Sequence, residues 1–252
     1  MAASSTTTQQ DRFGLLFEEW MQQQKQDLHE LLLGLTEEPK NESRLRELIS
    51  KALDHFKTYT NKRCIYAKEN AFAFFSPKWC TSFEASYLWI SGCRPTMAIR
   101  LVYALVGSEL ESQLEEFLRG VRRGNIAELS AAQLVAVNSL HGRTVMEEDK
   151  LSRKMTSLQE DMADNPLVQF AQGRKKEGGG GEREDMVGKK VESLAGLLEA
   201  ADKLRVGTMR ELVEEILTPL QAVELLVATK QIHLRMHEWG RNWDLSQGSS
   251  TG

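Results

Sequence analysis

The spacing of apolar residues constrains the fold of this 252-residue chain more than any other sequence feature. Apolar side chains recur every three or four residues almost throughout, which is typical of amphipathic helices. One stripe includes Phe13, Phe17 and Trp20, and a second begins at Leu45. There are only five prolines and no runs of alternating β-branched residues. We therefore predict an all-α fold, a single bundle of about seven to nine mostly long, antiparallel helices.

Short polar signals predict where the first helices begin and end. Ser76-Pro77 follows a long apolar-periodic stretch and should stop the second helix, because the residue before a proline disfavours helical backbone. Thr81 with Glu84 has the spacing of a capping box and should open the next helix. Ser108 with Glu111 has the same spacing, so we expect another helix to begin there.

The second half of the chain has its own boundary signals. Ser130 precedes a long Leu/Met-marked stretch and should start a long helix, which Asn165-Pro166 should end or bend. Two further helices are predicted over residues 191–204 and 208–239. Pro219 lies inside the last of these and should kink it, because proline removes a backbone hydrogen bond.

A glycine-rich segment, GRKKEGGGGERED, occupies residues 173–185. Four consecutive glycines between charges are typical of a flexible loop. This loop could separate two domains, but the two helices after it would bury little apolar surface alone. We therefore expect one helical domain over residues 13–243, with the loop as an excursion and disordered tails at 1–12 and 244–252.

Composition and missing motifs exclude several classes of function. The net charge of -4 and the absence of a basic block argue against a stand-alone nucleic-acid binder. The sequence contains no GxSxG, HExxH, P-loop or Rossmann glycine pattern, so we expect no enzyme. No apolar run is long enough to span a bilayer, so we expect no membrane association. Three widely spaced cysteines without a CxxC pair fit a reducing compartment and no zinc site.

Several segments resemble one plant family in the order in which they occur. Residues 87–102, YLWISGCRPTMAIRLV, resemble the W-I-G-G-F/C-R-P-[ST] segment of the Delay of Germination (DOG) domain. FEEWMQQQKQDLHEL at 17–31 resembles its first helix, and residues 128–164 resemble its central L-[ST]-x-x-Q-L helix. Residues 210–239 resemble its closing helix with an I-L-T-x-x-Q-A core. The likeness spans about residues 13–243, and the same domain forms the C-terminal part of TGA-type basic-zipper (bZIP) transcription factors.

This resemblance implies an all-helical plant regulator of seed dormancy and maturation that acts with abscisic-acid signalling, in nucleus and cytoplasm. The implied partners are clade A type 2C protein phosphatases, and the implied ligand is haem. Unlike the TGA members, the chain has no basic region or heptad zipper before the domain, so we expect no direct DNA binding. One alternative is a transcription cofactor that joins TGA-type bZIP factors. Another is a sensor of haem or another small ligand, and self-association stays open.

His233 and His237 are the candidate cofactor-binding residues. Their spacing of four places both imidazoles on one helix face, and the implied haem makes them candidates for axial ligands. Neighbouring residues of one helix cannot straddle a porphyrin, so one histidine as the ligand is easier to build. The alternative is that both simply place positive charge near a helix C-terminus. We expect no metal other than haem iron.

Glu18, Trp20 and Met21 are the candidate partner-binding residues. An aromatic side chain beside methionine can anchor an interface, with Glu18 at its rim. The alternative is that Trp20 belongs to the same core stripe as Phe13 and Phe17.

The segment around Ser91-Gly92 is predicted to be a corner between two helices rather than a site. Gly92 can end one helix in a left-handed conformation, and Pro95 suits the first turn of the next. Arg94 could bond the carbonyls of the ending helix or pair with a buried acid.

Overall fold

The computed structural model describes residues 2–37, 41–113, 115, 118–119, 123–164 and 180–248. These residues form helices and connecting turns without a β-strand, and an isolated bridge joins Trp89 to Gly92. The all-α prediction is therefore confirmed, and the seven α-helices of the described ranges agree with the expected number. None of the described helices is long and apolar enough to cross a membrane.

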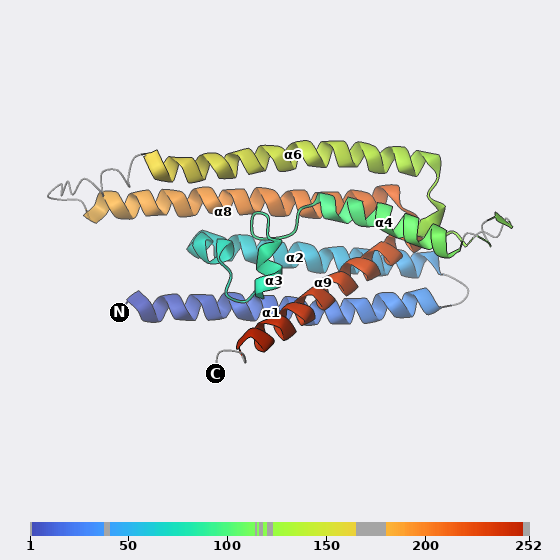
Figure 1. Ribbon diagram of the computed structural model, residues 1–252, viewed down its shortest axis with the longest axis horizontal. Coiled ribbons are helices and arrows are strands. Elements are labelled where there is room, and N and C mark those ends of the chain that lie inside the picture. Colours follow the sequence, from blue (N-terminus) through green and yellow to red (C-terminus); the bar gives the residue numbers. More distant parts are fainter. Residues whose placement is uncertain are drawn as a thin grey trace.

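Four long helices lie side by side and form the body of the molecule (Figure 1). Their order across the molecule is α1, α2, α8 and α6, and each runs antiparallel to its neighbour. Residues that follow the glycine-rich segment therefore pack inside the same bundle, because α8 lies between α2 and α6. The four helices are α1 (Ala2–Thr36), α2 (Glu42–Phe75), α6 (Ala131–Asp164) and α8 (Gly180–Arg210).

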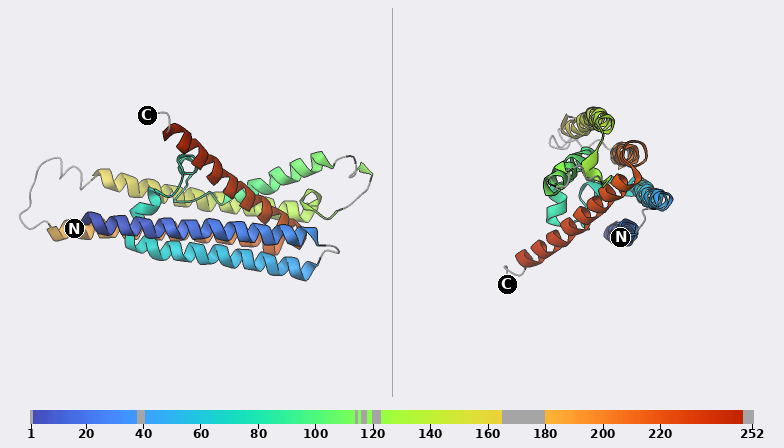
Figure 2. Two further views of the ribbon diagram at one scale, coloured as in Figure 1. Left: turned by 90° about the horizontal axis from the view of Figure 1, so that it is seen from below. Right: turned by 90° about the vertical axis from the view of Figure 1, so that its right-hand side faces the viewer.

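Three shorter or oblique helices complete the fold. The short α3 (Ser82–Ser86) and α4 (Thr96–Ser112) flank the predicted corner. The last helix, α9 (Pro219–Gly248), crosses α1 and α2 obliquely. Its C-terminal half contacts α3 and Phe17 of α1, and its end extends away from the long helices (Figure 2). A 3₁₀ turn (Ile126–Glu128) precedes α6, and a π-helical turn (Glu211–Ile216) joins α8 to α9.

The largest core cluster lies where the oblique α9 meets the long helices. It is built almost entirely from aliphatic side chains that the helical stripes bring together, as the spacing predicts. Two smaller clusters lie at the other end of the bundle, around Phe13 and around Trp89. Fully buried members of the main cluster include Leu31, Ile99, Val102, Val137, Leu212, Val223 and Leu225.

The first boundary predictions have mixed outcomes. The α2 helix ends at Phe75, so the stop at Ser76-Pro77 is confirmed. The capping box at Thr81 and Glu84 is also confirmed at the start of α3. The expected helix start at Ser108 is wrong, because α4 runs without a break through this residue to Ser112. A capping box requires a non-helical residue at its first position, and nothing in this continuous apolar stretch interrupts the helix.

The start of the long central helix is confirmed at Ser130. Its hydroxyl accepts a hydrogen bond from the backbone N–H of Gln133 at 3.2 Å. The Gln133 side chain accepts one from the backbone N–H of Ser130 at 2.9 Å, which completes a reciprocal cap.

The predicted boundary between the last two helices is wrong. The α8 helix continues to Arg210, and the break occurs at Leu217, whose backbone is extended. Pro219 therefore begins α9 instead of kinking it, because a proline in the first turn lacks only an N–H that would have no helical partner. Thr218 and Gln221 cap this start reciprocally, at 3.4 and 3.0 Å.

Helix also extends into segments predicted to be irregular. The α1 helix begins at Ala2, α9 continues to Gly248, and α8 begins at Gly180 within the expected loop. Residues 182–184 are Glu-Arg-Glu, which favours extension of α8 because both residue types are good helix formers. The rest of the predicted loop, residues 173–179, and the expected stop at Asn165-Pro166 lie outside the described residues.

Candidate functional site

The interface between α1 and α9 contains one residue of each predicted site, Trp20 on α1 and His237 on α9, although they come from opposite ends of the sequence. The ring of Phe17 packs edge-on to His237 at 5.5 Å between centroids. One turn along α1, the ammonium group of Lys230 lies 5.9 Å from the centroid of the Trp20 ring. Aromatic side chains of α1 therefore face the cationic and imidazole groups of α9.

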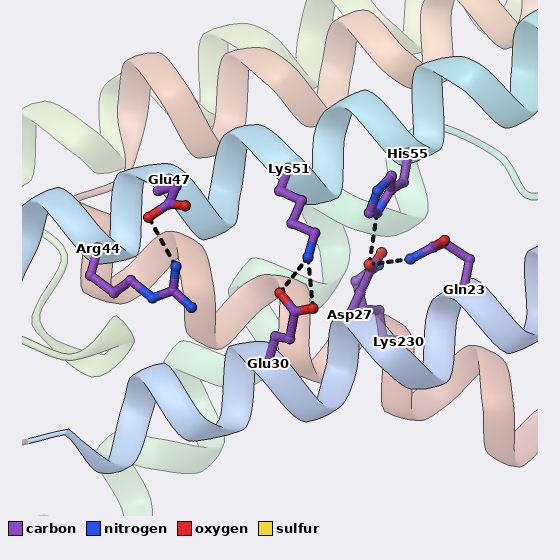
Figure 3. Close-up of polar contacts among 8 residues, drawn as sticks. All are labelled: Gln23, Asp27, Glu30, Arg44, Glu47, Lys51, His55 and Lys230. Atoms are coloured by element: carbon purple, nitrogen blue, oxygen red, sulfur yellow. Dashed lines mark hydrogen bonds and ion pairs between the residues drawn. The ribbon is translucent and has the colours of Figure 1, made fainter.

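A buried ion pair lies at the centre of this interface (Figure 3). The Lys230 ammonium group donates to Asp27 Oδ2 at 2.8 Å and to Gln24 Oε1 at 3.3 Å. The other oxygen of Asp27 accepts from Gln23 at 2.9 Å and lies 2.8 Å from His55 Nδ1. Burial lowers the pKa of Lys230, and the Asp27 carboxylate opposes this shift. The ion pair therefore links α9 to α1, and the contact of His55 with the Asp27 carboxylate links α2 to the same group.

Trp20 is buried in the core between α1 and α2. Its ring stacks on Tyr59 with centroids 4.4 Å apart and an interplanar angle of 4°, and only 8% of the residue is exposed. Burial also raises the pKa of Tyr59 to about 12. Met21 is equally buried, so within the predicted partner site only Glu18 lies on the surface. The packing is that of the core-stripe alternative, and a partner contact through these residues stays a prediction.

His237 is held by a carboxylate from α3. Its Nδ1 lies 2.9 and 3.1 Å from the two oxygens of Glu84, which is itself buried. One of those oxygens also accepts hydrogen bonds from the backbone and hydroxyl of Thr81. A neighbouring contact joins Ser82 to Asp244 of α9. Glu84 thus caps α3 and fixes the orientation of His237, two roles for one buried acid.

His233 lies one turn before His237 and is half-buried. Burial lowers the pKa of His233 to about 4; the Glu84 carboxylate opposes this shift, while His237 and Lys230 add to it. The ring is therefore neutral at pH 7, as an iron ligand must be. The two histidines share one helix face, so the residues present fit a single imidazole ligand rather than an axial pair. Among the described residues, no three His, Cys, Asp or Glu side chains are grouped in a way that could hold a metal ion.

The predicted corner is a four-residue turn over residues 89–92, and Arg205 of α8 bonds to its backbone. Trp89 and Gly92 exchange two backbone hydrogen bonds, which places Ile90 and Ser91 at positive φ of 44° and 61°. The Arg205 guanidinium donates to the carbonyls of Trp89, Ile90 and Cys93 at 2.5, 3.0 and 2.7 Å. These bonds satisfy carbonyls that the turn leaves without helical partners and offset the strain of two non-glycine residues at positive φ.

The same arginine is part of a buried charge cluster. Arg205 donates to Asp202 at 2.6 Å, and Arg63 of α2 donates to the carbonyl of Ser91 at 2.6 Å. The Nε of Arg63 lies 3.4 Å from the second Asp202 oxygen. Burial lowers the pKa of Arg205, and Asp202 opposes the shift. The turn is therefore clamped by two arginines that share one aspartate.

Arg94, which the sequence left with two alternatives, pairs with a buried acid. Its guanidinium lies 3.2 Å from Glu148 of α6, and Glu148 also accepts from the backbone N–H of Thr96 at 2.7 Å. Glu148 therefore caps the start of α4 from another helix. Gly92 does not supply a left-handed cap, because the positive φ values fall on Ile90 and Ser91 instead.

Comparison with known proteins gives the family. A family profile described as "DOG1: Seed dormancy control" matches residues 27–104. Protein DOG1-like 3 of Arabidopsis thaliana is 37% identical over 88% of this chain and 82% of its own length. The chain belongs to the DOG1 family.

Two more distant DOG1 relatives bear functional names. Protein RESPONSE TO ABA AND SALT 1 of Arabidopsis thaliana is 25% identical over 92% of this chain and 96% of its own length. Transcription factor TGA2 of the same plant is 24% identical over 89% of this chain but only 62% of its own length. The resemblance deduced from the sequence, including its TGA branch, is therefore confirmed.

The profile match covers only part of the site. Residues 27–104 begin at Asp27 and include Arg63 and the corner, whereas Lys230, Arg205 and the two histidines lie outside. Sequence reasoning did not identify the Asp27–Lys230 pair. The sequence did contain a signal for this pair. Asp27 and Lys230 each interrupt an otherwise apolar stripe, and a charged residue at such a buried position is rarely without a partner.

Proposed function

We propose that this DOG1-family protein is a non-enzymatic regulator of seed dormancy and abscisic-acid responses that acts by binding clade A type 2C protein phosphatases. The observation that carries the proposal is the match, over nearly the whole chain, to DOG1-like proteins and to a relative named for its response to ABA and salt. The relatives' names describe regulators rather than enzymes, which agrees with the absence of catalytic motifs from the sequence.

The outer face of α1 is the surface that we assign to the phosphatase. Leu15 is 58% exposed, and Glu18 and Glu19 are exposed beside it. An apolar side chain surrounded by acidic groups suits an interface with an apolar centre and a polar rim. The buried Trp20 and Met21 would pack beneath this surface, and Glu18 would contact the phosphatase at the rim of the interface, as predicted.

A pull-down with purified clade A phosphatases tests the proposal. We expect the wild-type chain to bind and the Leu15→Ser/Glu18→Lys variant to lose at least about tenfold in affinity, or about 1.4 kcal/mol. The matched control is Val135→Ser/Asp149→Lys on α6, where both residues are also exposed. Absence of binding by the wild type would exclude the phosphatase function, whereas equal loss in both variants would exclude the α1 face.

The Trp20→Ala variant serves a different purpose. Because Trp20 is buried against Tyr59, its truncation should cost about 3–5 kcal/mol of stability. Loss of binding by this variant would therefore report unfolding unless the melting temperature is preserved.

We propose haem binding through His237 as a second candidate function. Its Nδ1 faces Glu84, which leaves Nε2 as the ligating nitrogen and resembles the carboxylate–histidine pairs that orient ligands in metal sites. Bound haem would supply iron-centred ligand or redox sensing. A Soret band on haem titration that disappears in His237→Ala but persists in His233→Ala is the expected result, and an unchanged band in His237→Ala would exclude this ligand.

We also propose a transcription-related role, because TGA factors are among the relatives. The chain would act in the nucleus as well as the cytoplasm, and would reach DNA only through a bZIP partner. Co-precipitation with a TGA factor tests this, and DNA binding by the isolated chain would contradict it.

A further inference from the structure

The second half of α2 has a basic outer face that the other described helices leave uncovered. Between His55 and Cys80 the sequence contains five lysine or arginine residues and a single acid, Glu69, although the net charge of the whole chain is -4. The helices α3, α4 and α9 all lie on one side of the layer formed by the four long helices (Figure 2). On the other side, where α2 and α8 face outwards, no further described helix covers them.

Two large apolar side chains are exposed on this face. Ile65 is 60% exposed and Phe72 is 43% exposed. The opposite, buried side of the same part of the helix is continuous, and its members in one core cluster are Ala67, Ala71 and Phe74. Ile65 and Phe72 therefore both point outwards, despite the irregular backbone at Asn70 between them.

The positive charge of the face is not neutralised by the fold. Glu69, the one acid of the segment, is already paired with an arginine of α1 at 3.3 Å. Lys57 and Lys68 are exposed, and neither forms an ion pair with another residue of the described ranges. Lys68 acts on Glu199 of α8 through space, but the Glu199 carboxylate is bonded to Lys203 at 2.8 Å. The two lysines are thus available to carboxylates from outside the chain.

We propose that this face, defined by Lys57, Ile65, Lys68 and Phe72, is the docking site for an acidic amphipathic helix of a partner protein. Ile65, Lys68 and Phe72 follow one another at intervals of three and four residues, so they form one line along α2. A helix laid beside this line would bury its apolar stripe on the two apolar side chains and present its carboxylates to the lysines. On the adjacent α8, Gly196 has no atom within 4 Å of its Cβ position, which lets such a helix approach closely.

A membrane surface or a nucleic acid matches this face less well. A helix that lies in a bilayer interface needs a broad apolar face, whereas only two large apolar side chains are exposed here. A nucleic acid is bound through many phosphate contacts, and two unpaired lysines supply few of them. An acidic helix needs only one apolar stripe and a few carboxylates.

Fluorescence anisotropy of a labelled synthetic helix with the full chain tests the proposal. The acidic probe is a peptide of roughly 18 residues, or about five turns, with leucine at every third or fourth position and glutamate beside the leucines. The comparison peptide has lysine in place of glutamate. We expect the acidic probe to bind with a dissociation constant of about 10–100 μM, at least about tenfold tighter than the basic peptide. Raising the salt concentration should weaken this binding.

A charge reversal on α2 tests the role of the lysines. Lys57→Glu/Lys68→Glu should lose at least about tenfold in affinity for the acidic probe and should bind the basic peptide more tightly than the wild type does. The matched control, Arg153→Glu/Lys154→Glu, reverses two exposed charges on α6 and should bind the acidic probe like the wild type. Thermal unfolding of each variant verifies that it is folded.

Removal of the apolar contacts is an independent test. Ile65→Ser/Phe72→Ser should weaken binding of the acidic probe at least about tenfold, because the apolar centre of the interface is lost. Equal affinity of the wild type for the two peptides, an unchanged affinity in either α2 variant, or binding to phosphatidylserine vesicles in place of the acidic probe would each overturn the proposal. Failure of phosphatase binding would leave it intact, because that surface lies on α1.

Discussion

Replacing Arg205 with methionine should destabilise the protein more than any other single change at the corner. The guanidinium is only 8% exposed and donates to three carbonyls of the turn and to Asp202. Methionine has similar length but no donor, so the substitution removes the Arg205 hydrogen bonds from these carbonyls and leaves the buried Asp202 carboxylate with Arg63 alone. Removing one partner of a buried charge typically costs about 3–5 kcal/mol, and we expect about 4 kcal/mol here.

The assay is thermal unfolding followed by circular dichroism. For a chain of this size, 1 kcal/mol corresponds to a shift of about 2–4 °C, so Arg205→Met should melt about 8–16 °C below the wild type. Arg205→Lys should recover part of the loss, because lysine keeps the charge but cannot reach three carbonyls at once.

Arg94→Met is the matched control for this prediction. The Arg94 side chain is 48% exposed, and its partner Glu148 keeps the backbone N–H of Thr96 when the guanidinium is removed. The cost should therefore stay below about 1 kcal/mol. A melting temperature of Arg205→Met within the range of the Arg94→Met variant would refute the reasoning, because the turn would then not depend on its clamp.

Three further predictions follow from local geometry and burial. Gly240→Ala should lower the melting temperature, because its new methyl would collide with Thr81, whereas Gly142→Ala, with no atom nearby, should raise stability by about 0.5–1 kcal/mol. Burial holds the pKa of His233 at about 4, below its unfolded value, so stability should fall by up to about 3 kcal/mol as pH drops from about 6.5 to 4. A pH series of melting temperatures should show this slope in the wild type and a flatter one in His233→Gln. Burial raises the pKa of Cys80 to about 12, so mass spectrometry should find it alkylated far more slowly at pH 8 in the folded than in the unfolded protein.

The sequence alone determined the fold class, the family and some of the helix ends. The 3.6-residue period and local caps act over a few neighbouring residues, so Thr81, Ser130 and the stop at Ser76-Pro77 could be read directly. Where the capping-box spacing falls inside a continuous apolar stretch, as at Ser108, the helix continues through it. The role of Pro219 was predicted wrongly for a related reason, because a proline is compatible either with a kink inside a helix or with the first turn of a new helix.

Only the tertiary structure decided what the buried charges do and which face of each helix is free. Asp27 and Lys230 are separated by 203 positions, and Arg205 meets the corner from 112 positions away, so no local pattern links them. Trp20 and Trp239 are both tryptophans on amphipathic helices, yet one is stacked in the core and the other is exposed. Periodicity identifies an apolar face, but only the packing of the other helices determines whether that face is covered.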